Sequence, residues 1–203
     1  MQLIGPILLA TVAFWLGACP FAVWIGKWFL NKNIREYGDH NPGAANVFKA
    51  GSIKWGFVAV LLEIGKGIPF VVLANYYLNF SVAAILFVGL CSILGHAFSP
   101  MLGFNGGKAT AVTTGVFIAV PQKEIIIVFL LIMIVLFFIL DGDSWRITLA
   151  ISGCFVYILL IGGGLWEALF LISVLIILVI KNYDGLRRAP KRKKKIHIGF
   201  GKV

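Results

Sequence analysis

Seven runs of apolar residues take up most of this 203-residue chain and leave little room for any other structure. A helix needs roughly 20 apolar residues to cross the hydrocarbon layer of a bilayer, and most of the runs approach that length. The chain is 60% hydrophobic and 13% charged, whereas a soluble domain is about 25% charged. A water-soluble fold of this size could not bury so much apolar surface, so the sequence predicts a membrane domain. The runs cover residues 3–26, 55–78, 81–100, 109–122, 124–140, 147–163 and 165–180.

The predicted fold is an all-α, polytopic membrane helical bundle with about seven transmembrane helices. The run at 109–122 is the shortest and is compatible with a full span or a partial one. Residues 1–188 form the membrane domain, and we see no internal repeat and no soluble domain in it. Residues 189–203 form a basic cytoplasmic tail, which we expect to lack fixed structure because it is short of apolar residues.

Basic residues are distributed unequally between the connections that alternate along the chain. Sixteen of the 18 Lys and Arg residues follow the odd-numbered runs; the exceptions are Lys66 and Lys123. Basic connections stay in the cytoplasm, so the N-terminus should lie outside and the C-terminus inside. The net charge of +10 fits anionic membrane lipids better than nucleic acid, because the charges lie between apolar runs and in the tail.

The three cysteines lie singly in separate apolar runs, which predicts core packing and neither disulfides nor a metal site. Cys19 ends a stretch, Leu16-Gly17-Ala18-Cys19, that is similar to a lipoprotein cleavage box. A signal peptide carries basic residues before its apolar region, and none precedes Cys19 here. We therefore do not expect a lipid anchor.

The first loop, residues 35–51, is rich in glycine, asparagine and other small residues. Glycines permit the backbone conformations that turn successive N–H groups toward one point, and such a nest can hold a phosphate. A flexible connector is an equally good interpretation of the same composition. The candidate phosphate-binding residues here are Arg35, Asn41, Gly43, Asn46 and Lys49.

The second loop, residues 95–110, ends in Gly106-Gly107-Lys108 at the start of an apolar run. Backbone amides and a helix dipole could face an anion there while Lys108 supplies a full charge. The pattern is not a nucleotide-binding Walker A loop, because Leu102 stands where that motif has its first glycine. His96 is a candidate general base or phosphate donor, although a single histidine at a membrane interface is more often only hydrogen-bonded.

Glu63 and Lys66 lie three residues apart within the second apolar run, on one helical face. Charged groups at membrane depth are costly and are usually paired or functional. A structural ion pair and a catalytic or transport role both remain open for them. Thr148, at the start of the sixth run, could donate its hydroxyl to an anion.

Taken together, these segments resemble the bacterial acyl-phosphate-dependent glycerol-3-phosphate acyltransferase family, a membrane-embedded, seven-span type. The resemblance extends from the first run to about Arg188. The matching segments are LGACPF at 16–21 with IGK at 25–27, GDHNPGAANVFK at 38–49, EIGKG at 63–67, GHAFSPMLGFNGGKA at 95–109 and TLA at 148–150.

The resemblance implies transfer of a fatty acyl group from acyl phosphate to the 1-hydroxyl of sn-glycerol 3-phosphate. The product would be lysophosphatidic acid, the first step of phospholipid synthesis, in the bacterial inner membrane. It implies no metal or other cofactor, because acyl phosphate is already activated, and it implies a partner enzyme that supplies the acyl phosphate. Lys108 with the amides of Gly106 and Gly107 would clamp one phosphate. The other would bind Lys49, Asn41 and Asn46, and His96 and Thr148 would join Lys108 as catalytic residues.

The chain also departs from the family pattern. The departures are Asp39, His40 and Ala45 in the first loop, Ala109 after the lysine, and Asn182 and Gly185 in place of a histidine and an asparagine. They leave open a catalytically inactive member that binds lipid or a partner protein. A small transporter that uses Glu63 and Lys66 is a further alternative.

Overall fold

In the computed structural model, which describes residues 3–193, every one of the seven apolar runs is helical. The first run forms α1 (Ile4–Ala18) and α2 (Phe21–Phe29). The second forms α4 (Ile53–Gly65), α5 (Pro69–Val72) and the π-helical turn η2 (Leu73–Tyr77). The other five are α6 (Val82–Ala97), α7 (Thr110–Ala119), α8 (Lys123–Ile139), α9 (Asp143–Leu160) and α10 (Leu165–Lys181).

The shorter elements lie in the connections. The first loop contains the 3₁₀ turn η1 (Ile34–Glu36) and helix α3 (Ala44–Lys49), and the second loop contains the 3₁₀ turn η3 (Pro100–Leu102). After α10 the chain forms α11 (Tyr183–Leu186) and the strand β2 (Lys191–Arg192). This strand pairs antiparallel with β1 (Leu140–Asp141), which joins α8 to α9. The part of the expected tail at 191–192 is thus paired, and residues 194–203 lie outside the described residues.

Proline interrupts the first two runs. Pro20 follows Cys19, whose extended backbone ends α1, and Pro69 begins α5 three residues after Lys66. A proline lacks the N–H that would continue the helical ladder, and it disfavours helical geometry in the residue before it. Each of these two runs is therefore a broken helix, with Cys19 extended at the first break and Ile68 still helical at the second.

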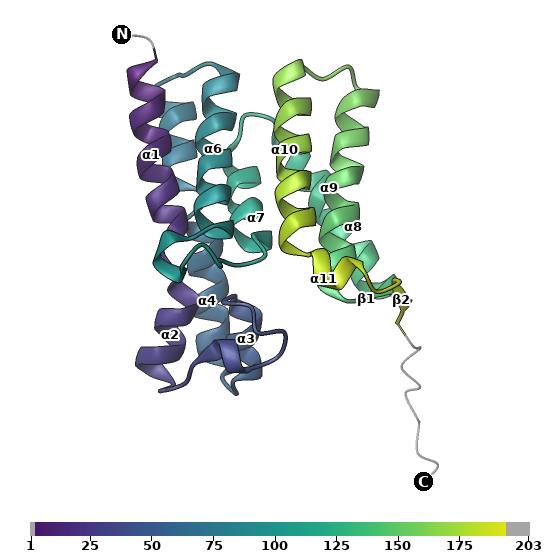
Figure 1. Cartoon of the computed structure of the whole chain (residues 1–203). Coiled ribbons are helices and arrows are strands. Elements are labelled where there is room, and N and C mark those ends of the chain that lie inside the picture. Colours follow the sequence, from purple (N-terminus) through teal and green to yellow (C-terminus); the bar gives the residue numbers. More distant parts are fainter. Residues whose placement is uncertain (1–2, 194–203) are drawn as a thin grey trace.

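The helices pack as a bundle in which α6 has a central place (Figure 1). α1 packs along one side of α6 and α10 along another, and α9 lies between α8 and α10. α7 contacts α4, α6 and α8. The crossing of α1 and α6 depends on Gly95, because a Cβ there would collide with the Phe14 carbonyl. Small residues allow such close helix approach in membrane proteins.

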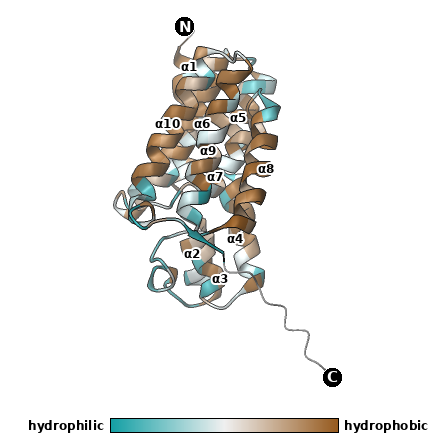
Figure 2. Ribbon diagram, turned by 90° about the vertical axis from the view of Figure 1, so that its right-hand side faces the viewer, coloured by the Kyte–Doolittle hydropathy of each residue, from teal (hydrophilic) through white to brown (hydrophobic). Residues whose placement is uncertain are grey.

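The surface of the bundle is apolar, and the hydrophilic residues gather mainly toward the end of the molecule that carries α2, α3 and β2 (Figure 2). Large apolar side chains such as Leu131, Ile134 and Ile176 are more than half exposed, as expected for a face in contact with lipid. Within residues 3–193, four helical stretches are long and apolar enough to cross a membrane: Ile4–Phe29, Ile53–Tyr77, Val82–Leu102 and Asp143–Leu160. The prediction of a helical membrane protein is confirmed.

Candidate active site

A cavity of about 320 Å³ lies where the first and second loops meet. Its polar side chains come from both loops and from the facing helices, and its apolar wall comes from α4, α7 and α8. The polar lining residues are Asp39, Asn41, Glu63, His96, Lys108, Thr110, Thr114 and Asp143, and the apolar ones include Val60, Ile64, Ala111 and Met133. A single ligand could therefore place a charged group and an apolar chain in the same cavity.

The first loop is shaped by Asn46, which is buried on α3. Its amide nitrogen donates to Asp39 Oδ1 at 3.0 Å and to the Asn41 carbonyl at 2.8 Å. Gly38 and His40 both have positive φ angles, so the backbone reverses on either side of Asp39. Asn46 was expected to bind a phosphate, and its nitrogen is instead engaged in holding the loop.

The second loop folds against His96. The Gly107 N–H donates to the His96 carbonyl at 3.1 Å. A Cβ at Gly106 would collide with the same carbonyl, and one at Gly107 would collide with His96 Nε2. The glycines are thus needed for close packing on His96, and the Gly107 amide, expected to face an anion, is already paired.

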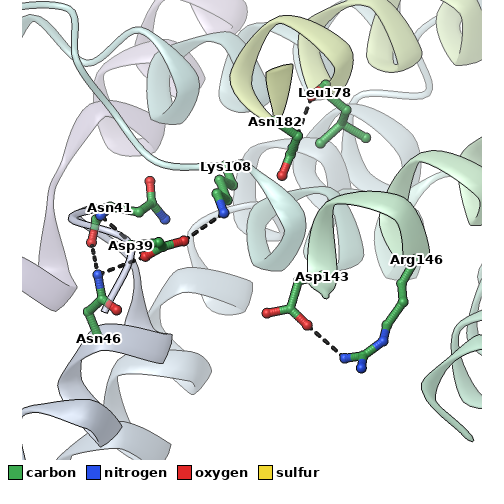
Figure 3. Close-up of polar contacts among 8 residues, drawn as sticks. All are labelled: Asp39, Asn41, Asn46, Lys108, Asp143, Arg146, Leu178 and Asn182. Atoms are coloured by element: carbon green, nitrogen blue, oxygen red, sulfur yellow. Dashed lines mark hydrogen bonds and ion pairs between the residues drawn. The ribbon is translucent and has the colours of Figure 1, made fainter. Parts of the chain in front are cut away.

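Lys108 reaches from the second loop to the first, where its Nζ lies 2.6 Å from Asp39 Oδ2 (Figure 3). Burial alone would raise the pKa of Asp39, but the hydrogen bond and charge of Lys108 and the hydrogen bonds from Asn46 and the Asn41 N–H lower it more. The pKa of this carboxyl group therefore lies below its ordinary value of 3.8. The side chains of Lys108 and Asp39 are 27% and 41% exposed, so the ion pair is accessible to solvent.

Glu63 and His96, which line this cavity, form a buried network with Lys66. Lys66 Nζ lies 2.7 Å from Glu63 Oε2, and His96 Nδ1 lies 3.1 Å from the same oxygen. If His96 is neutral, Nδ1 carries the proton and donates to the carboxylate, which leaves Nε2 facing Gly107. The network thereby connects α4 to the glycine loop that carries Lys108.

The same network supplies hydrogen-bond partners for the backbone groups at the break in the first run. Lys66 Nζ donates to the Cys19 carbonyl at 2.8 Å, and the Ala22 N–H donates to Glu63 Oε1 at 3.1 Å. The ammonium group thus lies at the C-terminal end of α1 and the carboxylate at the N-terminal end of α2, which matches the partial charges of both helix ends. Ser99 Oγ adds a donor to the Ala18 carbonyl at 2.6 Å.

Seven predicted residues do not line the cavity. Asn46, Lys66, Gly106 and Gly107 lie behind it in the contacts described above, and Arg35, Lys49 and Thr148 make other contacts. Arg35 is exposed in η1, and Lys49 is exposed at the end of α3 with its side chain against Gly38. Thr148 donates its hydroxyl to the Ser144 carbonyl at 2.8 Å within α9. Asn41 and Gly43, in contrast, line the cavity with Lys108 and His96.

The cavity also contains residues that sequence reasoning did not select. Thr110 and Thr114 lie four residues apart on α7, a spacing that puts both on one face of an apolar helix and that could have identified them. Asp143 begins α9, and its Oδ1 accepts from Arg146 Nη1 at 2.8 Å. Figure 3 shows Lys108 between the loop that carries Asp39 and the helices that carry Asp143 and Asn182.

The two departures at the end of α10 have different environments. Asn182 is buried, and its Nδ2 donates to the Leu178 carbonyl at 2.9 Å, while its Oδ1 has no hydrogen-bond partner among the described residues. Gly185 lies directly against the Ser144 hydroxyl, which would collide with a Cβ at this position. A larger residue at 185 would therefore require α9 or α11 to move.

Comparisons with known proteins agree with one another. A family model described as glycerol-3-phosphate acyltransferase matches residues 7–190. The chain is 33% identical to "Glycerol-3-phosphate acyltransferase 2" of Bacillus anthracis over 94% of this chain and 98% of that protein. It is 40% identical to "Glycerol-3-phosphate acyltransferase" of Listeria monocytogenes over 57% of this chain and 59% of that one.

Two crystal structures of PlsY (YgiH), an integral membrane glycerol 3-phosphate acyltransferase, have a similar fold. The glycerol 3-phosphate form superposes with a TM-score of 0.83 at 24% identity, covering 97% of this chain and 99% of that one. The lysophosphatidic acid form superposes with a TM-score of 0.80 at 25% identity over 91% of both chains.

Proposed function

Because the chain belongs to the glycerol-3-phosphate acyltransferase family, we propose that it transfers a fatty acyl group from acyl phosphate to the 1-hydroxyl of sn-glycerol 3-phosphate, giving lysophosphatidic acid. The observation that carries this proposal is the cavity that joins Lys108 and the polar first loop to the apolar side of α4 and α8. One substrate is a small phosphate ester and the other is an amphiphile with a phosphate head. The polar side of the cavity suits the phosphate groups of both substrates, and its apolar wall suits the acyl chain.

Lys108 is the proposed phosphate clamp. It lies two residues before α7, whose first residues line the cavity, so its charge adds to the positive end of the helix dipole. Asn41 offers its side chain from the first loop, and Arg35 and Lys49 add positive charge on the solvent side. His96 is proposed as a positioning residue that holds the Gly106–Gly107 segment, because both of its ring edges are packed inside the protein.

The apolar wall formed by Val60, Ile64 and Met133 is the proposed contact for the start of the acyl chain. In the reaction the 1-hydroxyl oxygen forms an ester bond with the acyl carbon, the bond between that carbon and the phosphate oxygen breaks, and the hydroxyl proton ends on the released phosphate. Negative charge develops on the departing phosphate. A positioned cation such as Lys108 stabilises that charge, and holding both substrates in one cavity supplies proximity.

We further propose seven crossings of a bacterial inner membrane, with the N-terminus outside and the C-terminus in the cytoplasm. Support comes from the unequal distribution of basic residues and from the position of α1's first residues at the end of the bundle opposite β2 (Figure 1). The cavity would then open near the cytoplasmic interface, where a soluble acceptor meets a donor held in the membrane by its acyl chain. An enzyme that makes acyl phosphate is the proposed partner.

The direct test is turnover by the purified protein in detergent micelles, with acyl phosphate, labelled glycerol 3-phosphate and no added cofactor. We expect labelled lysophosphatidic acid. Lys108→Ala should abolish the product, whereas Lys54→Ala, which removes an exposed lysine from the start of α4, should not. If the folded wild-type protein gives no product beside an active relative, the inactive-member alternative replaces this proposal.

A further inference from the structure

The clamp lysine already has an anion bound to it. Lys108 Nζ lies 2.6 Å from Asp39 Oδ2, and this contact joins two loops that are 69 residues apart in the chain. Both side chains line the cavity proposed for the substrates. Asp39 therefore stands at the place where the proposed function needs a phosphate.

The carboxylate is held in position from its other side. Asp39 Oδ1 accepts from Asn46 Nδ2 at 3.0 Å and from the Asn41 N–H at 3.4 Å. Asn46 is buried on α3 and is itself fixed by the Asn41 carbonyl. One oxygen bound to a cation and the other to amide donors is also how a protein commonly binds two oxygens of a phosphate.

The ion pair is weak enough to be displaced. Because its partners are 27% and 41% exposed, water screens it, and exposed pairs of this kind contribute little. A phosphate dianion carries more charge and more acceptor oxygens than a carboxylate, so it makes stronger charge-assisted hydrogen bonds to an ammonium group.

We propose that Asp39 is an internal competitor for the substrate phosphate at Lys108, and so sets how tightly this chain binds its phosphate substrates. The inference rests on the proposed function for the identity of the phosphate. Before substrate binds, Asp39 keeps Lys108 aligned and the two loops together. Substrate binding exchanges the carboxylate for a phosphate and frees the first loop from the second.

The experiment compares Asp39→Asn and Asp39→Ser with the wild type. Asparagine keeps the size of the side chain and an oxygen that can accept from Asn46, and serine removes the group that reaches Lys108. Glu36→Gln is the matched control, since it removes an exposed carboxylate from the same loop without touching Lys108. Inorganic phosphate binding to each purified protein in detergent is measured by calorimetric titration, which needs no turnover.

An ion pair of ordinary surface strength that must break first raises an apparent dissociation constant about two- to sixfold. We therefore expect phosphate to bind about two- to sixfold more tightly to both Asp39 variants and unchanged to Glu36→Gln. Lys108→Met should lose phosphate binding, both alone and combined with an Asp39 substitution. Equal or weaker binding to folded Asp39→Asn and Asp39→Ser would overturn the inference.

Turnover then separates the two substrates and the two proposals. If the phosphate of glycerol 3-phosphate is the competitor, its KM falls in the Asp39 variants and the KM for acyl phosphate does not; the opposite pattern identifies acyl phosphate. Tighter phosphate binding without any product from the wild type supports the Asp39 inference and contradicts the proposed function. Product from the wild type, with a phosphate affinity that is unchanged in the Asp39 variants, supports the proposed function and contradicts the Asp39 inference.

Discussion

Lys66→Met tests whether the buried network is a coupled unit. The substitution removes the ammonium group 2.7 Å from Glu63 Oε2 and the donor 2.8 Å from the Cys19 carbonyl. The side chains of Lys66 and Glu63 are 1% and 2% exposed, so water cannot replace the lost partner. Removing one member of a buried ion pair costs about 3–5 kcal/mol. Glu63 keeps the Ala22 N–H and His96 Nδ1, which places the expected loss toward the lower end.

The double variant distinguishes coupling from general damage. Glu63→Gln alone leaves the buried Lys66 ammonium group without its counter-charge, so it should cost about as much as Lys66→Met. Glu63→Gln with Lys66→Met removes both charges. The double variant leaves mainly the Cys19 carbonyl without a partner, which costs about 1–3 kcal/mol. The double variant should therefore be more stable than either single variant.

The assay is reversible unfolding in mixed micelles of sodium dodecyl sulfate and a mild detergent, followed by tryptophan fluorescence. For a chain of this size, 1 kcal/mol corresponds to roughly 2–4 °C in Tm, so a loss of about 3 kcal/mol should lower the Tm of Lys66→Met by about 6–12 °C. Lys54→Met, an exposed lysine on the same helix, should change stability by less than about 0.5 kcal/mol. A double variant that loses the sum of the two single losses would refute the coupling.

Gly107→Ala should greatly reduce turnover while the helix content is retained, because its Cβ would push the second loop off His96; Gly65→Ala, at a position open to a Cβ, is the silent control in the same assay. Gly95→Ala should destabilise the fold by about 1–3 kcal/mol through overpacking at the α1–α6 crossing, and unfolding in the same mixed micelles measures this. The pKa of Asp39 is lowered by folding, so its contact with Lys108 contributes stability above about pH 4 and loses it as the pH falls through the folded-state pKa. Between pH 6 and 2.5, the melting temperature of Asp39→Asn should therefore fall less steeply with decreasing pH than that of the wild type. Equal slopes for the two proteins would contradict this.

The helices could be predicted because the length of an apolar run is a local property. The breaks had local signals too, since Pro20 and Pro69 lie within runs that were predicted as single segments. The spacing of Glu63 and Lys66 put them on one face, but nothing in the sequence connected either of them to His96 or to the backbone at Cys19. Those contacts arise only when three helices pack together.

The same limit applies to the loops. Glycine and lysine in the second loop indicated an anion site, but the sequence could not show that the Gly107 amide would be used by His96 or that Asp39 would be the partner of Lys108. The ladder between Leu140–Asp141 and Lys191–Arg192 had no signal either. Two-residue strands are too short for any alternating pattern to develop.

The break at Cys19–Pro20 has a consequence for how the protein is inserted during synthesis. Unpaired backbone groups cost several kcal/mol each in lipid, and here the first helix obtains its partners from later parts of the chain: Lys66 and Glu63 in the second run and Ser99 after the third. The first hairpin cannot therefore reach its final form and wait in the bilayer for the rest. Release from the insertion machinery should be delayed until about one hundred residues have been made, because Ser99 is the last of these partners to be synthesised.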